Sequence, residues 1–217
     1  MGKIKSGILG GFNGKVGNVI GFAWKGRAVM RGIAQSVHDP KTEKQQLARE
    51  RFKMILALCD LIGFENLGGG LKAAGNALKK RITAGNEFVK LNYGAITGNE
   101  LGNLAVSYGD VAVSKGKCPG VILRGNVTSD DPGAAHIAWI NNAGQAGTSD
   151  ADVVKILAVD PEQEVTSVFS SNRSVGSVDL DLPGFMTGHA VHFYVYCISV
   201  DGSKVSNSVY AGKVTIA

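Results

Sequence analysis

The second half of this chain has the residue alternation of a protein built from short antiparallel strands. From about Leu104, apolar and polar residues alternate with a period of two, and Gly, Asn, Asp and Pro separate the alternating runs. Such alternation places every second side chain on one face of a sheet. Seven or eight short strands with this spacing predict an antiparallel β-sandwich, with Trp139 as a core residue. The predicted strands cover residues 105–113, 121–128, 136–140, 153–159, 165–170, 174–182, 190–200 and 204–216.

The last two predicted strands give the clearest pattern. Val191, Phe193, Val195 and Cys197 alternate with more polar neighbours, and Asp201-Gly202 follows as a hairpin turn signal. This pattern predicts a terminal β-hairpin with one face toward the core.

A helical segment is predicted before the strands. Asp39-Pro40 marks a boundary, and Thr42 with Gln45 forms a capping box, so a helix is expected to run to about Ile62. Its predicted apolar face carries Leu47, Phe52, Ile55, Cys59 and Ile62. Shorter helices are expected around Leu71, Ala74, Leu78 and Ile82, and around Phe88, Val89 and Ile96.

The first 39 residues alternate Gly with Ile, Val, Phe and Trp. Asn13-Gly14 and Lys25-Gly26 are turn signals, and residues 16–24 and 27–33 are expected to pair as strands. Glycine adds no side-chain packing, so this segment is expected to become ordered only against another surface. The predicted fold is therefore α+β, with a glycine-rich basic arm or β-ribbon (1–39), a helical segment (40–103) and a β-sandwich domain (104–217).

The charges are distributed unevenly along the chain. Residues 1–93 contain 16 basic and 6 acidic side chains, whereas residues 94–217 contain 7 basic and 12 acidic ones. Such asymmetry bears on partners and not on fold. The basic N-terminal part is expected to bind either an anionic polymer or the acidic C-terminal part of a neighbouring copy.

No sequence motif predicts catalysis, a cofactor or a metal. Gly10–Lys15 lacks the first Gly and the Ser/Thr of a phosphate loop, so a nucleotide site is not predicted. His189 and His192 fall on opposite faces of a strand and cannot bind one metal ion together. Asp130-Asp131 does not match the pattern of a calcium-binding loop. The three cysteines are expected to be buried free thiols. Neither a membrane span nor a secretory signal is recognised, so a cytoplasmic location, or one inside an assembled particle, is expected.

The opening residues resemble a known family. The run from Met1 to Gly17, with Val19-Ile20-Gly21, Trp24-Lys25-Gly26 and Val29-Met30-Arg31, is similar to an uncharacterised family of Bacteroidota genomes and some of their phages. The resemblance extends to the ending around 198–210 and implies no activity, only a phage or mobile-element setting. The C-terminal part separately resembles immunoglobulin or fibronectin sandwiches, which implies an architecture and no chemistry.

Two functional hypotheses remain open, both non-enzymatic. In the first, the arm docks on other copies or on particle proteins, through Phe12, Val19, Ile20, Phe22 and Trp24. In the second, the protein binds or packages nucleic acid, because cations interleaved with aromatics suit phosphate contacts and base stacking. The predicted anion-contacting residues are Lys3, Lys5, Lys15, Lys25, Arg27 and Arg31. A membrane-active arm is disfavoured by the internal turn, and no small-molecule substrate is evident.

Overall fold

The computed structural model describes residues 3–4, 10–24, 26–36, 39–67, 84–145 and 147–217. The chain divides into two compact units, residues 1–42 and 43–217. The helix predicted around Leu71, Ala74, Leu78 and Ile82 lies outside the described residues.

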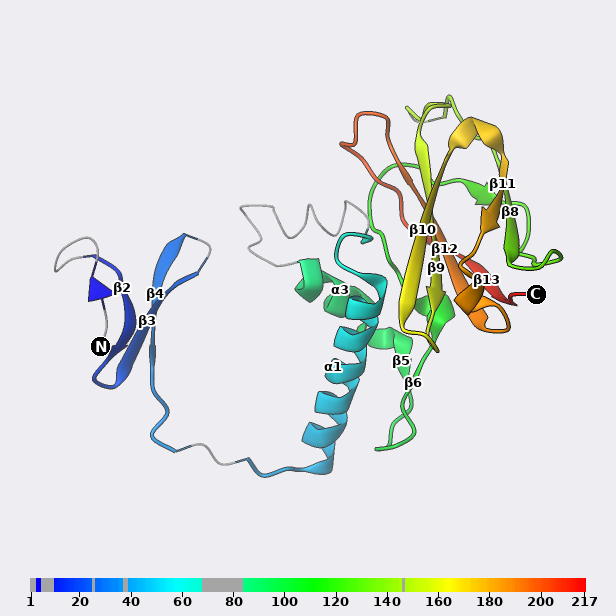
Figure 1. Cartoon of the computed structure of the whole chain (residues 1–217). Helices are drawn as coiled ribbons and strands as arrows, with labels where there is room; N and C mark the ends of the chain where they lie inside the picture. Colours follow the sequence, from blue (N-terminus) through cyan, green and yellow to red (C-terminus); the bar gives the residue numbers. More distant parts are fainter. Residues whose placement is uncertain (1–2, 5–9, 25, 37–38, 68–83, 146) are drawn as a thin grey trace. The chain divides into compact units, whose positions relative to one another are not determined.

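The first unit is a small antiparallel sheet, which we call the ribbon. Its strands follow the order β1-β2-β3-β4 (Figure 1) and are β1 (Lys3–Ile4), β2 (Phe12–Val16), β3 (Val19–Trp24) and β4 (Arg27–Gly32). The prediction that residues 16–24 and 27–33 pair is confirmed, since Val19 pairs with Gly32 and Trp24 with Arg27.

The turn predicted at Asn13-Gly14 is wrong. These two residues lie inside β2, and Val16 pairs with Val19, so the turn is Gly17-Asn18. Gly17 has φ of 58°, the positive value that the first position of a type II′ turn requires.

The second unit contains a two-sheet sandwich, as the alternation predicts. One sheet has the order β11-β8-β7 and the other the order β10-β9-β12-β13. The seven strands are β7 (Ile122–Leu123), β8 (Ala134–Ile140), β9 (Val153–Asp160), β10 (Val165–Asn172), β11 (Ser177–Asp181), β12 (Ala190–Ile198) and β13 (Val209–Thr215). Every pair of neighbouring strands in these two sheets is antiparallel. In chain order, β7, β8 and β11 form the three-stranded sheet, and β9, β10, β12 and β13 form the four-stranded sheet. This is the arrangement of immunoglobulin-like and fibronectin-type sandwiches, so the predicted fold class is confirmed.

The core between the two sheets contains the residues that alternation points inward. Trp139 of β8 is 1% exposed, and its indole N–H donates to the Arg173 carbonyl oxygen at 3.0 Å. Ile156 of β9 and Phe193 of β12 pack into the same cluster. Trp139 is thus the core residue that the sequence predicts.

Helices cover the outer face of the four-stranded sheet. α1 (Glu43–Ile62) and α3 (Ala84–Asn92) share a second core with Leu157 of β9 and Tyr194 and Tyr196 of β12. The Thr166 hydroxyl donates to the Leu61 carbonyl oxygen at 2.8 Å and ties α1 to β10. The two central strands, β9 and β12, are therefore buried on both faces, and β12 is buried along nearly its whole length.

Other details depart from the sequence-based expectation. The strand predicted at 105–113 is reduced to β6 (Ala105–Val106), and a 3-10 turn follows at Tyr108–Asp110. β6 pairs with β5 (Ile96–Thr97), so Ile96 lies in a strand and not in the predicted helix. The strand predicted at 121–128 is reduced to the two residues of β7. Phe52, predicted on the apolar face of α1, is 46% exposed.

The three cysteines are free and buried, as predicted. None of the described helices combines the length and hydropathy needed to cross a bilayer.

Candidate interaction surface

The register of the ribbon places the cations and two aromatic side chains on one face. In an antiparallel sheet, directly paired residues project to the same side and successive residues project to opposite sides. Ile20 pairs with Lys15 and with Arg31. Phe22 pairs with Val29, and Trp24 pairs with Arg27. We call this surface the cationic face, and it consists of Asn13, Lys15, Ile20, Phe22, Trp24, Arg27, Val29 and Arg31.

The opposite surface of the ribbon carries no charged residue among those that the structure describes. We call it the apolar face, and it consists of Phe12, Gly14, Val16, Val19, Gly21, Ala23, Ala28, Met30 and Gly32. A Cβ atom built on Gly21 would lie 2.7 Å from the Phe12 ring, so this ring covers Gly21. An aromatic ring over a strand glycine protects the backbone and helps to fix the register.

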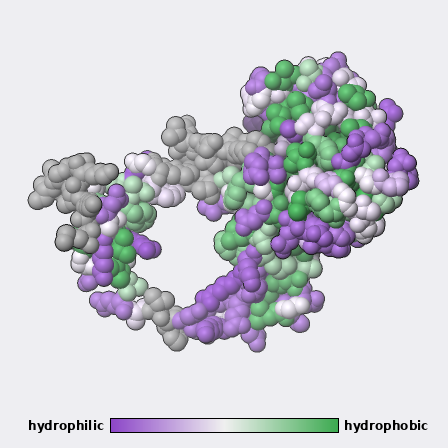
Figure 2. Space-filling model, viewed as in Figure 1, coloured by the Kyte–Doolittle hydropathy of each residue, from purple (hydrophilic) through white to green (hydrophobic). Residues whose placement is uncertain are grey.

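Almost nothing in the ribbon is buried. Among residues 10–24, 26–36 and 39–42, Gly21 alone is buried. Met30 is 67% exposed on the apolar face, and Trp24 is 46% exposed on the cationic face. Figure 2 shows hydrophobic and hydrophilic residues side by side on the surface of this unit. The described residues of this unit therefore cover neither face of the ribbon.

The predicted contact residues divide between the two faces. Phe12 and Val19 lie on the apolar face. Ile20, Phe22 and Trp24 share the cationic face with Lys15, Arg27 and Arg31. Lys3 pairs with Asn13 through its backbone, whereas Lys5 and Lys25 lie outside the described residues.

Three apolar side chains of β2, β3 and β4 that are larger than alanine were not among the predicted contact residues. Val16 and Met30 extend the apolar face, and Val29 lies between the aromatic and basic residues of the cationic face. Alternation counted from Gly17-Asn18 would have found them. All three lie in the segments 16–24 and 27–33 that were predicted as strands, but the turn at Asn13-Gly14 gave no register from which to assign their faces.

The cationic face combines two kinds of interaction. Residues 1–42 contain seven basic side chains and one acidic one, a formal charge of +6. Guanidinium and ammonium groups neutralise carboxylates or phosphates, and exposed aromatic rings bury large areas or stack on other rings. The face therefore fits an anionic partner that also offers apolar or aromatic surface.

The second unit shows no arrangement of groups poised for chemistry in its described part. His189 Nδ1 lies 2.8 Å from Asp160 Oδ2, and its Nε2 lies 4.0 Å from Glu162 Oε2. His136 Nδ1 lies 2.5 Å from Asp179 Oδ1. No group of three or more potential metal ligands occurs among the described residues. Burial raises the pKa of all three thiols, that of Cys59 to about 11, so they are poor nucleophiles near neutral pH.

Fold and surface together define an immunoglobulin-like sandwich protein that carries a separate cation-rich sheet. The chain belongs to the family of unknown function DUF6266, whose sequence profile matches residues 11–212. No curated protein matches the sequence. Part of the chain is similar to the fn3 domain of human collagen alpha-1(XX) chain, solved in solution, at 17% identity and a TM-score of 0.34, covering 47% of this chain and 87% of that domain.

Proposed function

We propose that the protein is a non-enzymatic assembly protein whose ribbon docks on another copy of the same chain. The observation that carries the proposal is the near absence of buried residues in the described ribbon, where both faces expose apolar side chains. A small sheet gains little stability until its apolar surface is covered. Trp and Arg, the residue types that most often dominate binding energy, are paired at the end of the β3–β4 hairpin. A particle built of many copies, such as a phage virion, is one setting for this contact.

Charge favours a second copy as the partner. The ribbon unit has a formal charge of +6, whereas the sandwich part of the second unit, residues 94–217, contains 7 basic and 12 acidic side chains, and residues 43–93 contain 9 basic and 5 acidic ones. Opposite charges on the two surfaces steer the encounter and select the orientation.

Removing the ribbon is expected to abolish self-association. A chain that begins at Glu43 retains both cores of the second unit and should remain folded. Light scattering and sedimentation at micromolar concentrations should detect oligomers of the full chain and only monomers of the shortened chain. The control is Val200→Glu in the full chain, which adds charge at an exposed residue of the second unit (62% exposed) and should leave association unchanged. Equal association with and without the ribbon would refute the proposal.

Nucleic-acid binding is the second candidate, because the register gathers Lys15, Arg27 and Arg31 beside Phe22 and Trp24. Three phosphate contacts predict a slope of about −3 for log affinity against log salt on duplex DNA. Replacing the three cations by Ser should abolish retardation of DNA and RNA at low salt. The matched control replaces the exposed Lys115, Lys117 and Lys204 by Ser and should retain binding. If the wild-type chain retards neither polymer at low salt, this candidate is eliminated.

A further inference from the structure

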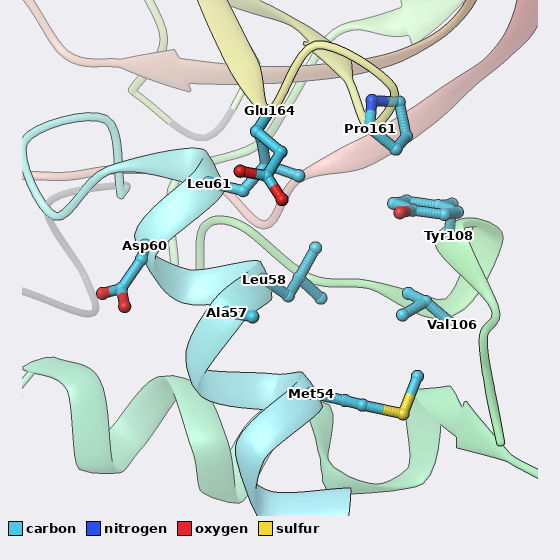
Figure 3. A pocket seen from close by; sticks show the side chains of 9 residues that line it. All are labelled: Met54, Ala57, Leu58, Asp60, Leu61, Val106, Tyr108, Pro161 and Glu164. Carbon is cyan, nitrogen blue, oxygen red and sulfur yellow. The ribbon is translucent and has the colours of Figure 1, made fainter. Parts of the chain in front are cut away.

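An open pocket lies on the second unit where α1 faces the sandwich. Its volume is about 530 Å³, within the roughly 300–1,000 Å³ typical of binding pockets. Three segments far apart in sequence form it: the last turns of α1, the stretch from β6 to the following 3-10 turn, and the turn between β9 and β10 (Figure 3). The residues that line it are Met54, Ala57, Leu58, Asp60, Leu61, Val106, Tyr108, Pro161 and Glu164.

The pocket combines an apolar floor with negative charge. Leu58 and Val106 line the floor in Figure 3, and the Tyr108 ring stands across the pocket from the Glu164 carboxylate. Asp60 points away on the outer side of α1. Among the described residues, Asp60 and Glu164 are the charged residues that line the pocket, and no Lys or Arg lines it.

The backbone holds Glu164 in an uncommon conformation. Its φ is 53°, in the left-handed region that glycine adopts most easily. Asp160 fixes the turn by accepting hydrogen bonds from the backbone N–H groups of Glu162 (2.9 Å) and Gln163 (3.2 Å). A non-glycine residue at such a position costs about 1 kcal/mol or more, which is consistent with a use for its side chain.

Exposed apolar residues continue from the pocket along α1. Leu56 is 38% exposed and Phe52 is 46% exposed, and both border a shallow depression that shares Ala57 and Asp60 with the pocket. Arg49 and Lys53 also line that depression, so the negative end of the surface is the end with Glu164. An aromatic group beside a cation therefore fits the pocket in one orientation.

We infer that the pocket receives the end of the β3–β4 hairpin of a second copy, with the Trp24 indole on the apolar floor and the Arg27 guanidinium against Glu164. Trp24 and Arg27 are a cross-strand pair on the same face of the ribbon, so they reach a partner surface side by side. An apolar ring next to a cation matches an apolar floor next to a carboxylate. This inference rests on the proposed self-association and identifies where the ribbon binds.

Two charge-reversal variants of the full-length chain test the contact, Arg27→Glu and Glu164→Lys. Each variant alone is expected to weaken self-association at least about tenfold, because like charges replace an ion pair. An equimolar mixture of the two variants is expected to recover association to within about threefold of the wild type. In such a mixed pair both contacts again join opposite charges, which is possible only if the ribbon of one chain enters the pocket of the other.

Fluorescence gives a second readout. The chain has two Trp residues, and Trp139 is already buried in the sandwich core. Emission of the wild-type protein should therefore shift to shorter wavelength as concentration rises, and Trp24→Ala should remove that shift. The matched control for Glu164→Lys is Glu162→Lys in the same turn, which should associate like the wild type. If Glu164→Lys fails to fold, Glu164→Gln keeps the side-chain size and should still weaken association.

The outcomes separate this inference from the proposed function. If the ribbonless chain fails to associate while Arg27→Glu and Glu164→Lys associate normally, self-association stands and the pocket is not its site. If both variants are weakened but their mixture stays dissociated, the contact between two chains is refuted. If the ribbonless chain associates normally, the proposed function is refuted, and the inference about the pocket, which rests on it, is refuted too.

Discussion

Replacing Arg173 by Leu is expected to lower the free energy of unfolding by about 3–5 kcal/mol, because the substitution leaves the buried Asp152 carboxylate without its cation. Arg173 is fully buried, and its Nε lies 3.3 Å from Asp152 Oδ2. Urea unfolding followed by circular dichroism measures the change. Such a loss is a large share of the stability of an ordinary domain.

The guanidinium also organises the loops at this end of the sandwich. Its Nη2 donates to the Pro119 carbonyl oxygen at 2.8 Å, and its Nη1 donates to the side chain of Asn142. Asn142 donates in turn to the Gly120 carbonyl oxygen at 2.9 Å. Removing Arg173 therefore also leaves several buried acceptors without a donor, and this increases the penalty.

The matched control for this prediction is Arg124→Leu, which replaces an exposed arginine of the same sandwich. It should change the unfolding free energy by less than about 0.5 kcal/mol. If Arg173→Leu also stays within about 1 kcal/mol of the wild type, the buried ion pair does not have the structural role assigned to it.

Acidification from pH 7 to pH 4 is expected to cost about 3 kcal/mol of stability through His192 alone. Burial lowers the pKa of His192 to about 4 from the ordinary 6.5, and Lys213 adds to this effect. The His192 ring stacks on the Tyr108 ring, with 4.0 Å between the two ring centroids, and its Nδ1 lies 2.8 Å from the Tyr210 hydroxyl oxygen. The neutral imidazole is thus the form that fits the folded protein.

The direction of the pH effect follows from the two pKa values. Between pH 6.5 and 4 the unfolded chain binds a proton at this residue and the folded chain does not, so acid favours unfolding. The contribution of neutral His192 to the free energy of unfolding is fully present above about pH 6.5. It decreases as the pH falls to about 4, and it levels off below that.

His192→Gln should flatten the stability profile between pH 6.5 and 4, as measured by urea unfolding at several pH values. His136→Gln replaces a histidine whose side chain is 48% exposed and should retain the acid-induced loss. An unchanged slope in His192→Gln would show that acid acts on other groups.

Much of the secondary structure followed from local sequence. The capping box at Thr42 and the apolar spacing predicted a helix ending near Ile62, and α1 is Glu43–Ile62. The alternation around Val191 and Phe193 located β12. These signals are local, because a cap needs one turn of helix and alternation needs one strand.

The candidate surface was predicted only in part. The cations and aromatics of the ribbon were identified by residue type, but their division between two faces depends on which residues pair. Both Asn13-Gly14 and Gly17-Asn18 can form a turn, and the actual pairing joins Val16 to Val19 and brings Phe12 over Gly21. A change of one residue in register would exchange the two faces.

The sequence by itself determined the antiparallel sandwich, the long helix and the basic, glycine-rich start of the chain, because each depends on near neighbours. Only the tertiary structure decided that the helices bury the outer face of β12, where Tyr194 and Tyr196 would otherwise face water. It alone joined Leu58, Tyr108 and Glu164 into one pocket and enclosed Arg173 with Asp152. Residues so far apart in the chain meet only when whole elements pack, and no local pattern encodes which faces meet.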